Sequence, residues 1–193
     1  MDLEKTAAAV RDLLTALDVD EGEHSEDTPE RVARAWSAAL GGYEVDPARH
    51  LARTFPAPPD AGLVIVSGIR VRSTCAHHML PIVGTATVAY RPAEGARIVG
   101  LSKLARVLGD YAARLQVQER LGYQVAATVQ TELEPIGAAC IITAEHGCMT
   151  MRGVQQSDTR TTTHALTGRW REDLSHPDVV AVLNNHRGDH HGR

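Results

Sequence analysis

The sequence predicts an α+β fold in which an antiparallel sheet carries two helices and is preceded by an N-terminal helical hairpin. Three observations predict this class: apolar residues recur at helical spacing near the N-terminus, runs rich in β-branched residues form two pairs, and two helical segments lie between those pairs. At 193 residues with 43% hydrophobic residues, one domain with its own core is expected, together with a helical appendage.

The N-terminal region, residues 1–55, is predicted to be helical. Residues 2–17 place a row of apolar side chains on one helical face, namely Leu3, Ala7, Val10, Leu13, Leu14 and Leu17. An acidic loop over 20–27 precedes Thr28-Pro29, where the pattern of N-cap and first-turn proline predicts a second helix that ends at Gly41-Gly42. We expect the two helices to pair as a hairpin.

Residues 56–175 are predicted to form the catalytic domain. Asp46-Pro47 is expected to start a short helix before it, and prolines at 56, 58 and 59 mark a linker. The predicted elements that follow are a strand over 63–66 and 69–72, its partner over 83–91, helices over 102–115 and 117–133, an apolar strand from 137 to 144 that continues or ends within 146–152, and a threonine-rich strand over 159–170. Residues 176–193, with His186, His190 and His191, are expected to be a flexible tail.

Composition excludes several classes of function. The formal charge of −4 argues against a general nucleic-acid binder. No apolar run approaches the roughly 20 residues that span a bilayer, and no signal peptide is visible. We therefore expect a cytoplasmic protein with no membrane or nucleic-acid partner.

Two short segments carry candidate metal ligands. Cys75 and His78 are three residues apart, a spacing that lets both reach one zinc ion where the backbone turns, and Pro81 favours such a turn. His146 and Cys148 are two residues apart, so in a strand their side chains would leave on the same face.

Three ligands would leave one position of a tetrahedral zinc ion open, which is the pattern of catalytic sites. A water molecule in that position loses a proton near neutral pH, and His77 and His146 would remain for acid and base catalysis. Spacing alone leaves two alternatives open: buried thiols without a metal, and a disulfide between Cys75 and Cys148, which a reducing compartment disfavours.

Four segments together resemble GTP cyclohydrolase I in sequence and in order. They are residues 73–81 (STCAHHMLP), 100–106 (GLSKLAR), 116–121 (QVQERL) and 146–153 (HGCMTMRG), with residues 28–33 (TPERVA) upstream. The resemblance implies the tunnelling fold (T-fold), in which subunits join their sheets into an oligomeric barrel, and a homodecamer of two stacked pentamers.

The resemblance also implies a zinc-dependent hydrolase that opens the imidazole ring of GTP and yields formate and 7,8-dihydroneopterin triphosphate. This is the first step towards tetrahydrofolate and one-carbon metabolism, another pterin, or a deazapurine. By resemblance Cys75, His78 and Cys148 bind the zinc ion, and His77 protonates N7 of the guanine. His146 and Ser102 act at the ribose.

Substrate binding is assigned on the same basis. Gln118 and Glu119 would select guanine, since a carboxylate accepts from N1–H and N2–H₂, a donor pair that adenine lacks. The triphosphate would be bound at the start of a helix and by four cations, namely Lys103, Arg106, Arg152 and Arg31. For Arg31 two alternatives stay open. Either it reaches the phosphates of a site in a neighbouring subunit, or it is a solvated side chain on the surface of its helix.

One residue departs from the family pattern. Ala76 stands where the family usually has Glu, beside two groups assigned to the site. Two further hypotheses therefore stay open: a divergent enzyme that opens the purine ring but stops at a formylamino-pyrimidine, and a non-catalytic homologue that binds a nucleotide or pterin.

Overall fold

The structure is a computed structural model that describes residues 1–19 and 22–191. The chain divides into two compact units, Met1–Gly41 and Gly42–Arg193. The division lies earlier than the expected boundary at residue 55. The reason is that the short helix η3 (Pro47–Leu51) packs against helix α3 (Leu101–Ala112), which belongs to the second unit.

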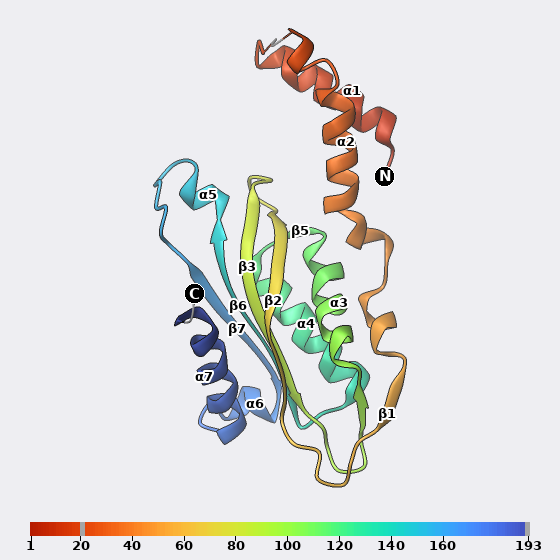
Figure 1. Cartoon of the computed structure of the whole chain (residues 1–193), viewed down its shortest axis with the longest axis vertical. Coiled ribbons are helices and arrows are strands. Elements are labelled where there is room, and N and C mark those ends of the chain that lie inside the picture. The colour runs from red at the N-terminus through yellow and green to blue at the C-terminus, as the bar shows by residue number, and fades with distance from the viewer. Residues whose placement is uncertain (20–21, 192–193) are drawn as a thin grey trace. The chain divides into compact units, whose positions relative to one another are not determined.

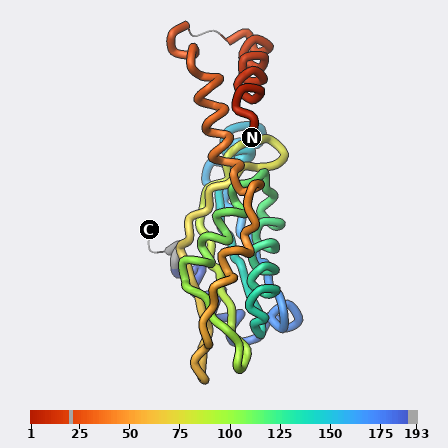
Figure 2. The backbone as a smooth tube through the Cα atoms, turned by 90° about the vertical axis from the view of Figure 1, so that its right-hand side faces the viewer, coloured from red at the N-terminus to blue at the C-terminus, as the bar shows by residue number. Residues whose placement is uncertain are grey.

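The first unit consists of two helices that lie side by side (Figure 2). Helix α1 (Leu3–Ala16) begins after Asp2, whose carboxylate accepts the backbone N–H of Lys5 at 3.1 Å. Helix α2 (Thr28–Ala39) follows a short turn, η1 (Gly22–His24), and an ion pair between Arg11 and Glu30 joins the two helices. The expected loop over 20–27 includes residues 20 and 21, which lie outside the described residues.

The short helical turn η2 (Gly41–Glu44) lies at the division between the units, and the second unit is built on a five-stranded sheet with the order β5-β2-β3-β6-β7. Its strands are β2 (Val64–Cys75), β3 (Pro81–Arg91), β5 (Leu115–Gln116), β6 (Gly137–His146) and β7 (Thr161–Gly168). The pairs β2/β3 and β6/β7 are antiparallel, as predicted, and the antiparallel pairing of β3 with β6 joins these two pairs into one sheet. The two runs predicted before residue 73 form one strand, β2, with an irregularity in register between Val66 and Ile69.

Besides the β3/β6 pairing, two pairings were not predicted from the sequence. The two-residue strand β5 runs parallel to the end of β2. Strands β1 (Thr54–Pro56) and β4 (Arg97–Val99) form a separate antiparallel pair, where the sequence indicated only a proline-marked linker. Both additions are too short to leave a periodic signal in the sequence.

Helices cover both faces of the main sheet (Figure 1). Helices α3 and α4 (Gln118–Leu133) pack on one face, where Leu104, Leu108 and Val125 meet alternate residues of the strands in the larger buried cluster. Helices α6 (Arg169–Glu172) and α7 (Pro177–His191) pack on the other face, with Trp170 and Val182 in a second buried cluster. These contacts establish the mixed α+β class.

Helix α7 occupies the segment that the sequence analysis expected to be a flexible tail. Val179 and Val182 are buried against the sheet, and Asp178 forms an ion pair with Arg91 of β3. The ring nitrogens of His186 lie 2.8 Å from the hydroxyls of Thr87 and Thr143. The side chains of His190 and His191 lie outside the described part of the chain. No helix in the described ranges combines the length and apolar character needed to cross a bilayer.

Candidate metal centre

Strand register brings the two predicted ligand segments together at one end of the sheet. Strand β3 lies between β2 and β6, and its first residues pair with the last residues of both: Pro81 pairs with Thr74, and Ile82 pairs with His146. Cys75 therefore ends β2 beside the point where His146 ends β6. Two segments about seventy residues apart in sequence thus meet at the same end of the sheet.

The loop after β2 is a closed turn. The backbone N–H of Met79 donates to the carbonyl of Cys75, and the N–H of Cys75 donates to the carbonyl of Leu80, both at 2.8 Å. Met79 adopts a left-handed conformation with φ of 55°. The turn expected from Cys75, His78 and Pro81 is therefore present, and it folds His78 back over the end of the strand.

The segment after His146 differs from the prediction. The sequence indicated that the strand continues or ends within 146–152, whereas β6 ends at His146 and the helical turn α5 (Gly147–Thr150) follows. A Cβ atom at Gly147 would lie 3.0 Å from Pro81 and 3.3 Å from Leu80, so the backbone turns in close contact with the neighbouring loop. Cys148 therefore projects from a turn, and not from the same strand face as His146.

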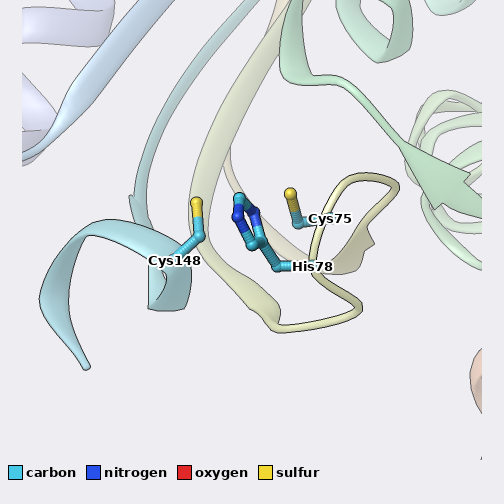
Figure 3. A group of neighbouring side chains, drawn as sticks. All are labelled: Cys75, His78 and Cys148. Carbon is cyan, nitrogen blue, oxygen red and sulfur yellow. The ribbon is translucent and has the colours of Figure 1, made fainter. Parts of the chain in front are cut away.

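The three predicted ligands face one another (Figure 3). One donor atom from each of Cys75, His78 and Cys148 lies within 4.8 Å of the other two. Donors bound to zinc at about 2.0–2.3 Å in a tetrahedron lie roughly 3.3–3.8 Å apart, so small side-chain movements would close the site. Cys75 and Cys148 are separate thiols, not a disulfide. The donor set and its spacing fit a zinc ion with three protein ligands.

The electrostatics of the thiols also fit a cation. Burial raises the pKa of Cys148, and the neighbouring Cys75 raises it further, while Arg152 lowers it. Two thiolates this close repel each other, so without a metal the protonated thiols are favoured. A divalent cation between them would favour the thiolates instead. Cys140, by contrast, is fully buried in the core, and burial raises its pKa to about 12.

Two further side chains lie against the predicted ligands. Nδ1 of His77 is 3.9 Å from Sγ of Cys75. Nη1 of Arg152 is 3.0 Å from Nε2 of His78, a contact that the sequence analysis did not anticipate. His77 is exposed to solvent beside the cluster, so it is accessible to a substrate.

His146 is held on its other side by helix α4. Its Nε2 lies 2.7 Å from Oε1 of Gln118, the first residue of that helix. Burial lowers the pKa of His146, and the negative charge of Glu119 partly offsets this effect. Gln118 was expected to contact guanine, but its amide is buried and bonded to protein groups. A single sequence holds no signal for this, because the partners are distant along the chain.

Glu119, in contrast, lines an open cavity. The cavity has a volume of about 500 Å³ and lies between α4, β7 and α7, with Tyr123, His164 and Leu166 also in its wall. A cavity of this size accommodates a nucleobase with room to spare. The adjacent residues Gln118 and Glu119 therefore face different surroundings.

Three predicted site residues lie away from this cluster within one chain. Ser102, Lys103 and Arg106 are near the start of α3, whereas the last residue of that helix, Ala112, accepts a hydrogen bond at 2.7 Å from Ser73, beside Cys75. Ten helical residues separate Ser102 from Ala112, which corresponds to about 15 Å. Figure 1 shows α3 lying along the sheet, with its C-terminal end toward β5 and its start far from this end.

Arg31 belongs to the first unit. Its guanidinium pairs with Asp27 of its own helix segment at 2.8 Å, and both side chains are exposed. Within the second unit, the structure thus groups Cys75, His78, Cys148, His77, His146, Glu119 and Arg152 around one end of the sheet, and it places Ser102, Lys103 and Arg106 along α3.

Comparison with known proteins identifies one family. The family model described as GTP cyclohydrolase I matches residues 6–183. The protein named GTP cyclohydrolase 1 from Thermoanaerobacter pseudethanolicus is 41% identical over 187 residues, covering 96% of this chain and 98% of the relative. Its namesakes from Carboxydothermus hydrogenoformans and Mycobacteroides abscessus are each 44% identical, covering 97% and 94% of this chain and 97% and 90% of the relatives.

Among solved structures, a crystal structure titled archaeosine synthase QueF-Like in the apo form aligns with a TM-score of 0.44 and 17% identity. It covers 58% of this chain and 96% of the other. This similarity is too weak to support a conclusion about fold or function.

Proposed function

Since the chain belongs to the GTP cyclohydrolase I family, we propose that it opens the imidazole ring of GTP with water and forms formate and 7,8-dihydroneopterin triphosphate. The observation that carries the proposal is the convergence of Cys75, His78 and Cys148 within 4.8 Å of one another. The product would enter a folate, other pterin or deazapurine pathway.

The proposal assigns zinc as the metal, because two thiols and an imidazole are soft and borderline ligands that suit it. A zinc ion bound there would activate a water molecule for attack on C8 of the guanine. The turn at 76–80 and the helical turn α5 present the three donors from two segments whose backbones are in contact.

Acid and base catalysis is assigned to the two histidines beside the cluster. His77 lies 3.9 Å from Sγ of Cys75 and is exposed, so it is available to protonate N7 of the guanine as the ring opens. His146, together with Ser102, would transfer protons at the ribose.

Guanine recognition is assigned to Glu119. Its carboxylate only accepts hydrogen bonds, and it faces the cavity bounded by α4 and β7. Adenine offers no matching pair of donors, and an unpaired acceptor would cost several kcal/mol. The negative charge of Glu119 also acts on His146, and this effect raises the pKa of that ring.

The triphosphate is assigned to Lys103, Arg106 and Arg152, with Arg31 supplied by a neighbouring subunit. Lys103 lies in the first turn of α3, where backbone N–H groups point outward and favour an anion, and Arg106 lies about one turn further along. Because the first turn of α3 is about 15 Å from the end of the sheet that carries the metal ligands, we propose that Lys103 and Arg106 of another subunit complete the phosphate site beside Arg152.

We further propose an oligomer with the tunnelling fold, which would bring the separated groups of different copies together. Strand β7 is at the edge of the sheet, with no strand on its outer side in the part of the chain that the structure describes. Apolar side chains such as Leu13 and Leu17 of the first unit are exposed. We propose that edge strands of neighbouring copies pair into a barrel, that the first unit acts as a helical hairpin in assembly, and that the oligomer is a decamer.

We place this activity in the cytoplasm. Cys75, Cys140 and Cys148 are free thiols. A reducing compartment would keep the neighbouring thiols of Cys75 and Cys148 from forming a disulfide.

The test is incubation of the purified, zinc-loaded protein with GTP, followed by measurement of formate and of a pterin that fluoresces after oxidation. Both products are expected. Neither product with any divalent metal would contradict the proposal, and nucleotide binding without turnover would identify a non-catalytic homologue.

A second candidate, an enzyme that stops after ring opening, is favoured by Ala76, which places a methyl group beside Cys75 where the family has a carboxylate. Accumulation of a formylamino-pyrimidine triphosphate in the same assay would identify it. Comparison with Ala76→Glu then measures what the missing carboxylate contributes. Ala76 uses its backbone N–H to bond Gln116 at 2.9 Å, and this bond is available to any residue, so the variant is expected to fold.

A further inference from the structure

We propose that Gln118 is a positioning residue that holds the imidazole of His146 in the tautomer with hydrogen on Nε2, so that Nδ1 is the ring nitrogen that carries the lone pair. The inference rests on the proposed function, because Gln118 acts in the reaction only through His146. It replaces the expectation that Gln118 binds guanine.

The orientation of the Gln118 amide follows from its partners. Its Nε2 lies 3.0 Å from the carbonyl oxygens of Ile142 and Thr161, and 3.1 Å from the hydroxyl of Thr163. Carbonyl oxygens only accept, so the amide group that faces them is the NH₂. The reverse orientation would place the amide oxygen against two other oxygens and leave the carbonyls unpaired.

The tautomer of His146 follows in turn. With its NH₂ directed at the strands, Gln118 presents Oε1 to Nε2 of His146 at 2.7 Å. An amide oxygen has no hydrogen to donate, so Nε2 of the ring must donate. In the neutral ring the other nitrogen, Nδ1, then carries the lone pair. Backbone carbonyls of β6 and β7 thereby select, through Gln118 of α4, the tautomer of the side chain that ends β6.

Burial makes this arrangement rigid. Gln118 is 1% exposed, and its side chain joins the first turn of α4 to β6 and β7. Ile142 and Thr163 face each other across those strands in the sheet register. Rotation of the amide would leave buried polar groups unpaired at a cost of about 1–3 kcal/mol each. His146, at the end of β6, therefore meets a fixed acceptor.

The same contacts leave Gln118 unsuited to base recognition. Both of its amide N–H bonds and its oxygen already face protein groups. Glu119 is rotated by about 100° around the helix from Gln118 and lines the cavity instead. Guanine selection by Glu119 and tautomer selection by Gln118 are separate tasks of adjacent residues.

The direct test is the tautomer itself. Zinc-loaded protein labelled with ¹⁵N-histidine is examined by solid-state NMR at mildly alkaline pH, with the His146 signals assigned by their loss in His146→Asn. A protonated Nε2 and an unprotonated Nδ1 are expected at His146. A protonated Nδ1 would overturn the proposal, and this measurement on the unsubstituted protein needs no variant of Gln118 to fold.

Kinetics of Gln118→Met test the role in the reaction. We expect kcat for GTP to fall at least about tenfold, and no further than in His146→Asn, while KM changes by less than about threefold. In the double variant Gln118→Met/His146→Asn, no additional loss of kcat is expected, because the two residues act as one unit. An increase in KM with unchanged kcat, or additive losses, would show that Gln118 acts on the substrate directly.

Gln130→Met is the matched control. Gln130 also joins α4 to β7, since its amide donates to Pro135 and accepts from Thr167 at the opposite end of the helix. Its replacement should cost stability but leave kcat unchanged. If the protein does not turn over GTP, the proposed function fails, and the NMR measurement still decides whether Gln118 sets the tautomer.

Discussion

Nη1 of Arg152 lies 3.0 Å from Nε2 of His78, so a cation assigned to the triphosphate is in contact with a ligand assigned to the metal. The contact places triphosphate binding and metal binding next to each other. It also allows them to be separated by experiment, because only one of the two side chains can bind zinc.

Replacement of Arg152 by Ala is expected to raise KM for GTP about 10- to 100-fold, which corresponds to the loss of one hydrogen bond to a charged group. Zinc content should be unchanged, as measured by metal analysis alongside steady-state kinetics. Arg97→Ala is the control, since Arg97 bonds Thr54 on the separate β1/β4 pair. Loss of zinc in Arg152→Ala would show that the arginine supports the metal site.

Cys148→Ser is expected to lose most of the bound zinc and all measurable turnover, because a serine hydroxyl does not ionise near neutral pH and is a poor zinc ligand. Metal content after dialysis provides the measurement. Cys140→Ala should retain zinc, since Cys140 lies in the core. Equal zinc content in the two variants would contradict the assignment of Cys148.

His77→Ala separates catalysis from metal binding. Turnover should fall by about 10²- to 10⁴-fold, the usual contribution of a general acid, while zinc remains bound. His24→Ala, at an exposed position in the first unit, is the control for loss of a histidine. A variant that keeps its rate would exclude His77 from proton transfer.

Glu119→Gln tests base selection. The amide can accept only one of the two hydrogen bonds from guanine, so the ratio of kcat/KM for GTP over inosine triphosphate should fall by about tenfold or more. Glu132→Gln is the control, because Glu132 is exposed near the other end of the same helix. An unchanged ratio would assign guanine selection to another group.

The ion pair between Arg91 and Asp178 predicts a pH-dependent stability. The hydrogen bond from Arg91 lowers the pKa of Asp178, so the stabilisation is fully present above the pKa of the unfolded chain, about 4, and is lost as pH falls through the lower folded value. Asp178→Asn should lower stability by about 1–3 kcal/mol at neutral pH.

Denaturant unfolding at a series of pH values measures this effect. The difference between the original protein and Asp178→Asn should shrink as the pH falls below about 4. Asp158→Asn, at an exposed position, should have little effect at any pH. A difference that is constant with pH would show that the charge of Asp178 is not what anchors α7.

The elements with strong local patterns were predictable from the sequence. The β-branched run before Cys75, the amphipathic helices and the turn at His78 each have a local cause in neighbouring residues, and the structure contains all of them. The meeting of Cys75 with Cys148 was expected only through the resemblance, because it depends on the strand register of β2, β3 and β6.

The elements that were missed depend on tertiary contacts. The apolar residues of helix α7 are confined to one short run, and its buried face comes from Val179, Val182 and an ion pair with β3. The turn α5 arises where Gly147 meets Pro81 of another strand. The role of Gln118 depends on backbone carbonyls of two distant strands, which carry no residue-specific signal.

The length of α3 has a consequence for genetics. On the proposed roles, each chain offers its thiols, its histidines and Arg152 at one end of that helix, and Ser102 and Lys103 at the other. Two defective alleles, one damaged at each end, would therefore complement each other when expressed together. A damaged copy mixed with intact copies would impair neighbouring sites as well as its own.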